Sequence, residues 1–174
     1  MNLNIPIEKD KTTEIDLILI HETGIYVFEI KHYKGTIYGN NTGTIWTQYF
    51  RTSKNNTFKN PILQNEYHIN ALKKIFTDIP IKSIVVFTNP NCNLKVRDSN
   101  PNVSVCTIYN LNKTLEQWFQ NLENKFSIEE IDKIFDKLSK YSQMQEVILY
   151  DGKKESFISW LEPALQKLEE EKIN

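Results

Sequence analysis

Two apolar segments separated by a short turn constrain the fold of this chain more than any other feature. The first is EIDLILI at residues 14–20, and the second is GIYVFEIKH at residues 24–32, with the turn sequence HETG at residues 21–24. Short runs that are rich in β-branched and aromatic residues and bounded by turn residues are typical of a β-hairpin. We therefore predict antiparallel strands over Ile15–Ile20 and Ile25–His32.

Charged residues within these strands need an explanation, because a buried charge is costly unless it is paired or binds a metal. A two-residue turn and a four-residue loop give the same register, in which Asp16 faces Glu29 and Glu14 faces Lys31. Side chains alternate with period two, so all four charges share one face. Directly opposed acids repel each other, which favours a divalent cation between Asp16 and Glu29. The alternative is a salt bridge from Glu14 to Lys31, with the other two acids in water.

The predicted cluster has the composition of a site that cleaves phosphodiester bonds. Carboxylate oxygens suit Mg²⁺ or Mn²⁺, which polarises a phosphoryl oxygen and lowers the pKa of a water molecule. A neighbouring lysine can orient that water or offset charge in the transition state.

Local patterns predict the remaining elements. Pro61 suits the first turn of a helix, and Ser127 with Glu130 forms a capping-box pattern before another helix. The predicted segments are a hairpin of Thr36–Tyr38 with Thr44–Phe50, a helix from Pro61 to about Phe76 with faces defined by Leu63, Tyr67, Asn70, Ala71, Lys74 and Ile75, strands over Lys82–Phe87 and Val103–Thr107, helices over Leu111–Leu122 and Ser127–Tyr141, and a charged segment over Lys153–Lys172. This order indicates one α/β domain with a C-terminal helical extension.

Charge is distributed unevenly along the chain. The net charge of −1 argues against nucleic-acid binding through bulk electrostatics. From Ile30 to Asn65, however, there is no acidic residue. The segment holds the basic residues Lys31, Lys34, Arg51, Lys54 and Lys59 and the aromatic residues Tyr33, Tyr38, Trp46, Tyr49, Phe50 and Phe58. Such a composition suits a nucleic-acid strand, although an ordinary hairpin with solvated lysines gives the same pattern.

The chain has no apolar run near the roughly 20 residues needed to cross a bilayer, and its N-terminus has no signal-peptide pattern. Its two cysteines, Cys92 and Cys106, are not spaced as a CxxC pair and favour reduced thiols. We therefore expect a cytoplasmic protein with no membrane partner.

Asp16 followed by FEIKHYKGTIYG resembles the D…ExK signature of the PD-(D/E)xK nuclease superfamily. The runs EIDLILI, GIYVFEIKHYKGTIYG, NPILQNEYHINAL and IVVFTN, together with Trp46, more narrowly resemble the NERD (nuclease-related) domain. The similar part spans about Thr13 to Asn89. The resemblance implies a restriction-endonuclease-like core with a central mixed β-sheet flanked by helices. We assign this core to residues 1–110 and the helical extension to residues 111–174.

The resemblance also implies roles for individual residues. Asp16 and Glu29 would bind Mg²⁺ or Mn²⁺, Lys31 would be the catalytic lysine, and Gln64 would help to shape the active site. His68 lies one helical turn beyond Gln64 and is expected to support the site by packing or by contacting phosphate. We expect Lys34, Arg51, Lys54 and Lys59 to contact nucleic acid.

One departure from the family pattern concerns the N-terminus. The family usually has a core helix with a further acid before the first strand, whereas residues 1–13 are too short and contain a proline. The helix is therefore expected to be missing and the site to be incomplete. Either the sequence is a truncated product, or Glu14 or Glu8 replaces the missing acid, or the domain has lost catalysis and retained binding. The expected function is a metal-dependent deoxyribonuclease in DNA processing, repair or defence. The alternative is a non-catalytic module that binds nucleic acid, a protein partner or a second copy, the latter two through its C-terminal helices.

Overall fold

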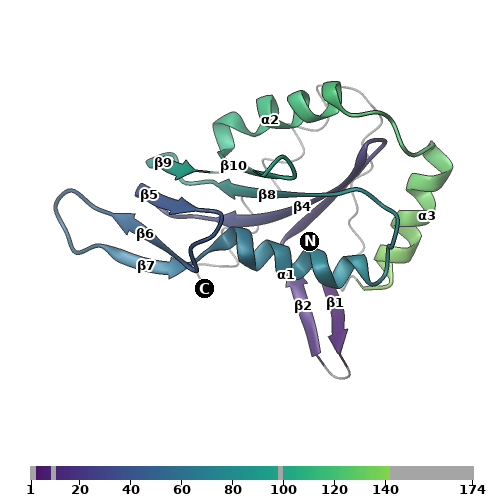
Figure 1. Ribbon diagram of the computed structural model, residues 1–174, viewed down its shortest axis with the longest axis horizontal. Helices are drawn as coiled ribbons and strands as arrows, with labels where there is room; N and C mark the ends of the chain where they lie inside the picture. The colour runs from purple at the N-terminus through teal and green to yellow at the C-terminus, as the bar shows by residue number, and fades with distance from the viewer. Residues whose placement is uncertain (1–2, 9–10, 98–99, 142–174) are drawn as a thin grey trace.

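The computed structural model describes residues 3–8, 11–97 and 100–141 (Figure 1). Its elements in chain order are β1 (Leu3–Glu8), β2 (Lys11–Ile15), β3 (Leu17–His21), β4 (Gly24–Lys31), β5 (Gly35–Asn40), β6 (Ile45–Tyr49), β7 (Asn56–Lys59), α1 (Pro61–Lys73), β8 (Ile81–Phe87), β9 (Cys92–Arg97), β10 (Val103–Thr107), α2 (Ile108–Asn121) and α3 (Ile128–Ser139). The predicted segment Lys153–Lys172 lies outside the described residues.

A four-stranded sheet with strand order β10-β8-β4-β3 forms the centre of the structure. The β3–β4 pair is antiparallel, whereas β4 and β10 both run parallel to β8, so the sheet is mixed. Helices α1 and α2 cover its opposite faces (Figure 1). The alternation of β4 explains this arrangement, because Tyr26, Phe28 and Ile30 pack with α2 while Ile25 and Val27 pack with α1. The predicted α/β core with a mixed sheet and flanking helices is confirmed.

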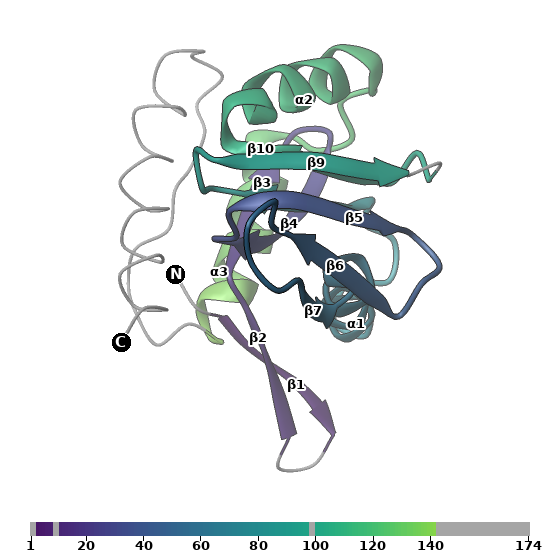
Figure 2. The same ribbon diagram turned by 90° about the vertical axis from the view of Figure 1, so that its left-hand side faces the viewer.

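A second four-stranded sheet, with order β7-β6-β5-β9, continues from the first (Figure 2). Strands β5 and β9 follow β4 and β8 after short connections and again pair in parallel. The predicted hairpin is confirmed as the antiparallel pair of β5 and β6. Strand β9 was not predicted, although Cys92, Leu94 and Val96 alternate with exposed polar residues as a half-buried strand does.

The N-terminal residues correct the predicted position of Glu14. Strand β2 leaves the central sheet at a bend at Asp16 and pairs with β1, so that Glu14 faces Asn4 and not Lys31. The resulting hairpin extends away from the body in both views (Figures 1 and 2). Its base is fixed by Ile5 and Ile15, which are fully buried in the core between α1 and α3. The prediction failed because strand alternation does not continue through a bend.

Helix α1 starts at Pro61 as predicted and ends at Lys73, before the predicted end near Phe76. The Asn60 side chain accepts a hydrogen bond from the Ile62 amide and caps the helix. The buried side of the helix carries Pro61, Ile62, Asn65, His68, Ile69, Ala71 and Leu72. Two of these side chains are polar, which hides the apolar pattern from which a helix face is normally predicted. Asn65 has a structural role here, since its amide donates to the Val27 carbonyl of β4 and to Ser83 of β8.

Helices α2 and α3 complete the core. Leu111 and Leu115 of α2 pack on one face of the central sheet, and Ile131, Ile134 and Leu138 of α3 pack at the cluster that contains the N-terminal hairpin. The predicted capping box of Ser127 is confirmed. The division of the chain at residue 110 stays a prediction. No helix among the described residues is long and apolar enough to span a membrane.

Candidate active site

The predicted cluster forms where β4 leaves the central sheet. The hairpin register is confirmed, with Leu17 paired to Phe28 and His21 paired to Gly24. Asp16 lies one residue before this ladder begins, and its Oδ2 accepts a hydrogen bond of 2.8 Å from the Ile30 amide. The bend therefore keeps the Asp16 carboxylate beside the end of β4, even though the residue belongs to no strand.

Glu29 is the most buried charged residue of the cluster, with 1% of its surface exposed. Lys31 Nζ lies 2.5 Å from its Oε1, and His68 Nε2 lies 3.3 Å from its Oε2. Both carboxylate oxygens thus face a nitrogen of a basic side chain. Lys31 can reach Oε1 because residues two apart on a strand point to the same face. These contacts compensate a carboxylate that would otherwise be costly to bury.

Helix α1 supplies the other side of the cluster. Gln64 and His68 lie one turn apart on the helix, so both side chains reach the same region. Gln64 Oε1 accepts a hydrogen bond of 3.1 Å from Lys31 Nζ. The lysine ammonium is therefore held between a carboxylate from its own strand and an amide from the helix, which restricts its position more than either contact alone.

His68 is buried and connects Glu29 to the N-terminal hairpin. Its Nδ1 lies 2.6 Å from Thr13 Oγ1 on β2. Its Nε2 has no well-directed hydrogen bond among the described residues, despite the nearby Glu29 oxygen. Thr13 was not anticipated, because a single threonine in an exposed-looking segment gives no signal until β2 is positioned. The burial of His68, at 6% exposure, suits packing within the site.

The electrostatic surroundings keep Glu29 ionised. Burial raises the pKa of its carboxyl, but His68 and Lys31 together outweigh burial and hold the pKa below its ordinary value. The site therefore presents a carboxylate anion near neutral pH.

The donor set fits a hard divalent cation. Asp16 and Glu29 would hold Mg²⁺ or Mn²⁺, since Mg²⁺ usually takes one or two carboxylates and completes its shell with water and substrate phosphate. No group of three or more His, Cys, Asp and Glu side chains that could hold a metal occurs within the described part of the chain. Two observations support the fit: the Glu29 carboxyl is held in its ionised form, and the hydrogen bond from the Ile30 amide keeps the Asp16 carboxylate at the same end of β4.

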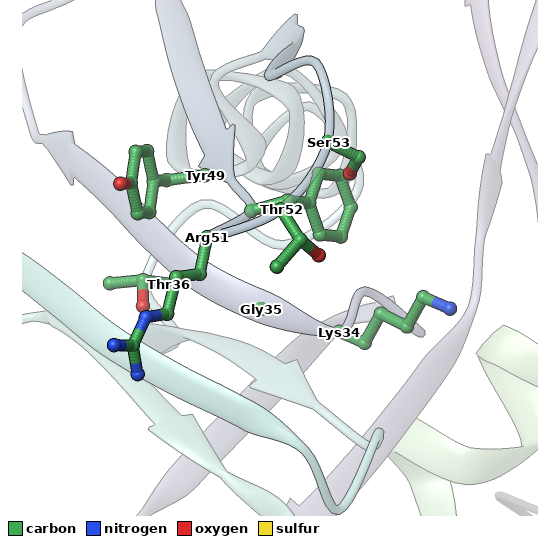
Figure 3. A pocket seen from close by; sticks show the side chains of 8 residues that line it. Lys34, Gly35, Thr36, Tyr49, Arg51, Thr52 and Ser53 are labelled. Atoms are coloured by element: carbon green, nitrogen blue, oxygen red, sulfur yellow. The ribbon is translucent and has the colours of Figure 1, made fainter.

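The remaining predicted residues lie outside this cluster. Glu14 is exposed on β2, and Glu8 is exposed with an ion pair of 3.5 Å to Lys11. Lys34 and Arg51 line an open pocket on the second sheet (Figure 3). Two further predicted basic side chains are exposed, Lys54 in the loop after β6 and Lys59 at the end of β7.

Comparison with known proteins agrees with this geometry. The family model described as nuclease-related domain, NERD, matches residues 1–88. An uncharacterized protein of Bacillus anthracis is 42% identical over 96 residues, which make up 54% of this chain and 44% of the relative. The chain thus spans less than half of that relative's length. No solved structure matches the chain significantly. The matched region contains β1 to β8 and the whole Asp16–Glu29–Lys31–Gln64 cluster, and the chain therefore belongs to the nuclease-related domain family.

Proposed function

We propose that the protein is a metal-dependent nuclease that hydrolyses phosphodiester bonds of DNA, in processing, repair or defence. The observation that carries this proposal is the Lys31 ammonium, held between Glu29 and Gln64 at the point where Asp16 meets the end of β4. A fixed ammonium against one carboxylate, with a second carboxylate at the same end of β4, combines the positive and negative groups that phosphoryl transfer requires.

Each residue of the cluster would have a distinct role in hydrolysis. Hydrolysis joins a water oxygen to phosphorus and breaks the bond from phosphorus to one sugar oxygen, which then takes up a proton. Asp16 and Glu29 would hold Mg²⁺, which supplies Lewis-acid activation of the phosphoryl group and of water when it is bound. Lys31 Nζ would donate a hydrogen bond to a phosphate oxygen as negative charge develops there. Gln64 would keep Nζ in position through its present contact.

The basic residues outside the cluster suit the DNA backbone. Lys34, Arg51, Lys54 and Lys59 are all exposed and all lie in the acid-free segment that follows β4. Contacts of this kind add affinity without sequence preference, because phosphates are the same at every base pair. The thiols of Cys92 and Cys106 are unpaired, which suits the reducing cytoplasm as the setting.

A second candidate is a non-catalytic module that binds DNA or a protein partner, including a second copy, through its C-terminal helices. The observation that favours it is the hairpin ahead of Asp16: within the described residues no helix brings a third acid to the cluster. The two candidates differ in whether bound DNA is cut.

The test is to incubate the purified protein with single-stranded and duplex DNA in Mg²⁺, in Mn²⁺ and in EDTA. We expect cutting with at least one metal and none with EDTA. A double variant with Asp16→Asn and Glu29→Gln keeps the size of both side chains and should not cut. Equal cutting by this variant would refute the assigned site, and DNA binding without cutting under any metal would favour the second candidate.

Metal binding can be measured without activity. Because a ligand that binds only the folded state stabilises it, Mn²⁺ should raise the melting temperature of the wild type more than that of the double variant. A matched concentration series of monovalent salt at equal ionic strength controls for screening. Equal shifts for both proteins would argue against Asp16 and Glu29 as the ligands.

A further inference from the structure

An open pocket of about 640 Å³ lies on the second sheet, beside the loop that follows β6. Its lining consists of Lys34, Gly35, Thr36, Tyr49, Phe50, Arg51, Thr52 and Ser53. Among these described lining residues none is acidic, whereas two are cationic, two are aromatic and three are Ser or Thr with a hydroxyl group. Figure 3 shows the Lys34 and Arg51 side chains reaching out in opposite directions from either side of Gly35. The pocket is within the size range of small-ligand sites.

The floor of the pocket is formed by backbone that cannot easily rearrange. Gly35 has φ of +86°, and a Cβ atom there would lie 2.7 Å from the Tyr49 carbonyl oxygen. The absence of a side chain therefore keeps the floor open. The carbonyl of Lys34 accepts a hydrogen bond of 2.8 Å from the buried Gln48 side chain. The Phe50 amide donates to Asn55 Oδ1 at 3.2 Å, which closes the loop over residues 51–54.

Aromatic side chains add an apolar surface to the pocket, and Figure 3 shows Tyr49 on the same side of Gly35 as the Arg51 guanidinium. Tyr49 is 42% exposed, and its edge-on pairing with the Tyr38 ring, with centroids 6.3 Å apart, leaves it accessible. The Phe50 ring lies next to Gly35, since a Cβ atom there would be 3.2 Å from Phe50 Cδ1. A flat apolar surface next to separate cations and hydroxyl groups matches the parts of a nucleotide, whose base stacks while its phosphate forms ion pairs and hydrogen bonds.

The pocket is also close to the candidate active site along the chain. Lys31 and Lys34 are three residues apart, so at most about 11 Å of extended chain joins them. The pocket therefore lies no more than a few nucleotide lengths from the cluster at Lys31.

We infer that this pocket holds one unstacked nucleotide of a single DNA strand, with its base against Tyr49, one flanking phosphate at Arg51 and the other at Lys34. This inference rests on the proposed function and adds a substrate class to it, namely single-stranded DNA or a single-stranded end. A base inside a duplex is stacked on both sides and cannot enter such a pocket without being extruded.

The test measures binding of labelled DNA in EDTA, so that no strand is cut and a failure of catalysis does not affect the result. One probe is a thymidine strand of about 12 nucleotides. A set of abasic probes has the same length and lacks one base at a different position in each strand, and a blunt duplex serves for comparison. We expect the wild type to bind the intact strand about fivefold or more tighter than the duplex and than the least favourable abasic strand.

Two pocket variants should distinguish the contribution of the base to binding from that of the phosphate. Tyr49→Val keeps a strand-forming residue but should remove the preference for the intact strand over the abasic strands. Arg51→Ala should keep that preference and lower the slope of log affinity against log salt by about 0.7. The matched control is Arg97→Ala, because Arg97 is exposed on β9 and pairs with Asn40 at the far end of β5 from Gly35. Tyr109→Ala on α2 controls for loss of an exposed tyrosine.

Three results would overturn the inference. The first is equal binding of intact and abasic strands by the wild type, and the second is a base preference that survives Tyr49→Val in a variant with wild-type melting temperature. The third is an equal loss of salt dependence in the Arg51 and Arg97 variants, which would indicate overall charge and no pocket. If the wild type prefers the intact strand but does not cut DNA with either metal, the inference about the pocket is supported and the proposed nuclease activity is refuted.

Discussion

At the scale of single residues, His21 shows how a local hydrogen bond fixes a protonation state. Its Nδ1 accepts a hydrogen bond of 3.2 Å from the Thr23 amide, which an imidazolium could not accept. Its ring stacks on Phe119 of α2 with centroids 3.8 Å apart. Burial lowers the pKa of His21, and Glu22 raises it to a smaller extent. The residue thereby joins the β3–β4 turn to α2 in its neutral form.

This arrangement predicts a dependence of stability on pH. Because the pKa of His21 is lower in the folded than in the unfolded state, its contribution is complete above about pH 6.5 and is lost as pH falls through the lowered pKa. His21→Phe retains an aromatic ring against Phe119 but cannot be protonated. Between pH 7 and about pH 5 the wild type should therefore lose more unfolding free energy than the variant in urea denaturation. Parallel pH profiles would contradict this account.

At the scale of elements, Asn60 joins two parts of the fold that are distant in sequence. Its side chain caps α1 and also donates to the carbonyls of Asn40 and Gly43 in the β5–β6 turn, at 3.1 and 2.6 Å. The residue is 2% exposed, so water cannot replace these partners. It thus fixes the start of the helix that carries Gln64 and His68 into the site.

Removing the Asn60 side chain should lower the free energy of unfolding more than removing an ordinary helix cap does. Asn60→Ala is expected to lower the free energy of unfolding by about 2–4 kcal/mol, from the lost cap together with the Gly43 carbonyl left without its side-chain donor. The Asn40 carbonyl keeps the hydrogen bond from the Trp46 indole. Ser127→Ala is the matched control, because Ser127 caps α3 at an exposed position and should cost about 0.5–2 kcal/mol. Urea midpoints at unchanged m-value measure both effects. A cost for Asn60→Ala no greater than for Ser127→Ala would show that the turn contacts contribute nothing.

The strands and helices differ in how well the sequence predicted them. The β3–β4 register was predictable because both strands are apolar and the turn between them is short, and the capping box marked α3 directly. Glu14 was misplaced because the bend at Asp16 has no local sequence signal, and β1, which draws β2 away, is a six-residue strand with a proline. The buried face of α1 was not predicted, because Asn65 and His68 on it are polar residues whose tertiary partners are not visible in the sequence.

At the scale of the whole molecule, the site depends on three parts of the chain that meet at one end of the central sheet. The bend after β2 contributes Asp16, the end of β4 contributes Glu29 and Lys31, and α1 contributes Gln64 and His68. The sequence predicted Asp16, Glu29, Lys31 and Gln64 as neighbours, since D…ExK and the following helix segment are motifs, but it wrongly added Glu14. It did not predict Thr13, because that contact exists only when the hairpin, the sheet and α1 are all folded.

The most direct test of this account is the single-turnover rate of DNA cleavage by the wild type, Lys31→Met and Lys31→Arg. Lys31→Met leaves the buried Glu29 carboxylate without its nearest cation and should melt earlier, so the rates are compared well below its melting temperature. Lys31→Arg keeps the charge but not the compact ammonium, and should fold more stably than Lys31→Met. We predict that both variants bind DNA nearly as well as the wild type and cut it about a hundredfold or more slowly. A wild type that cuts, together with a folded Lys31→Met variant that cuts at the same rate, would contradict the central claim.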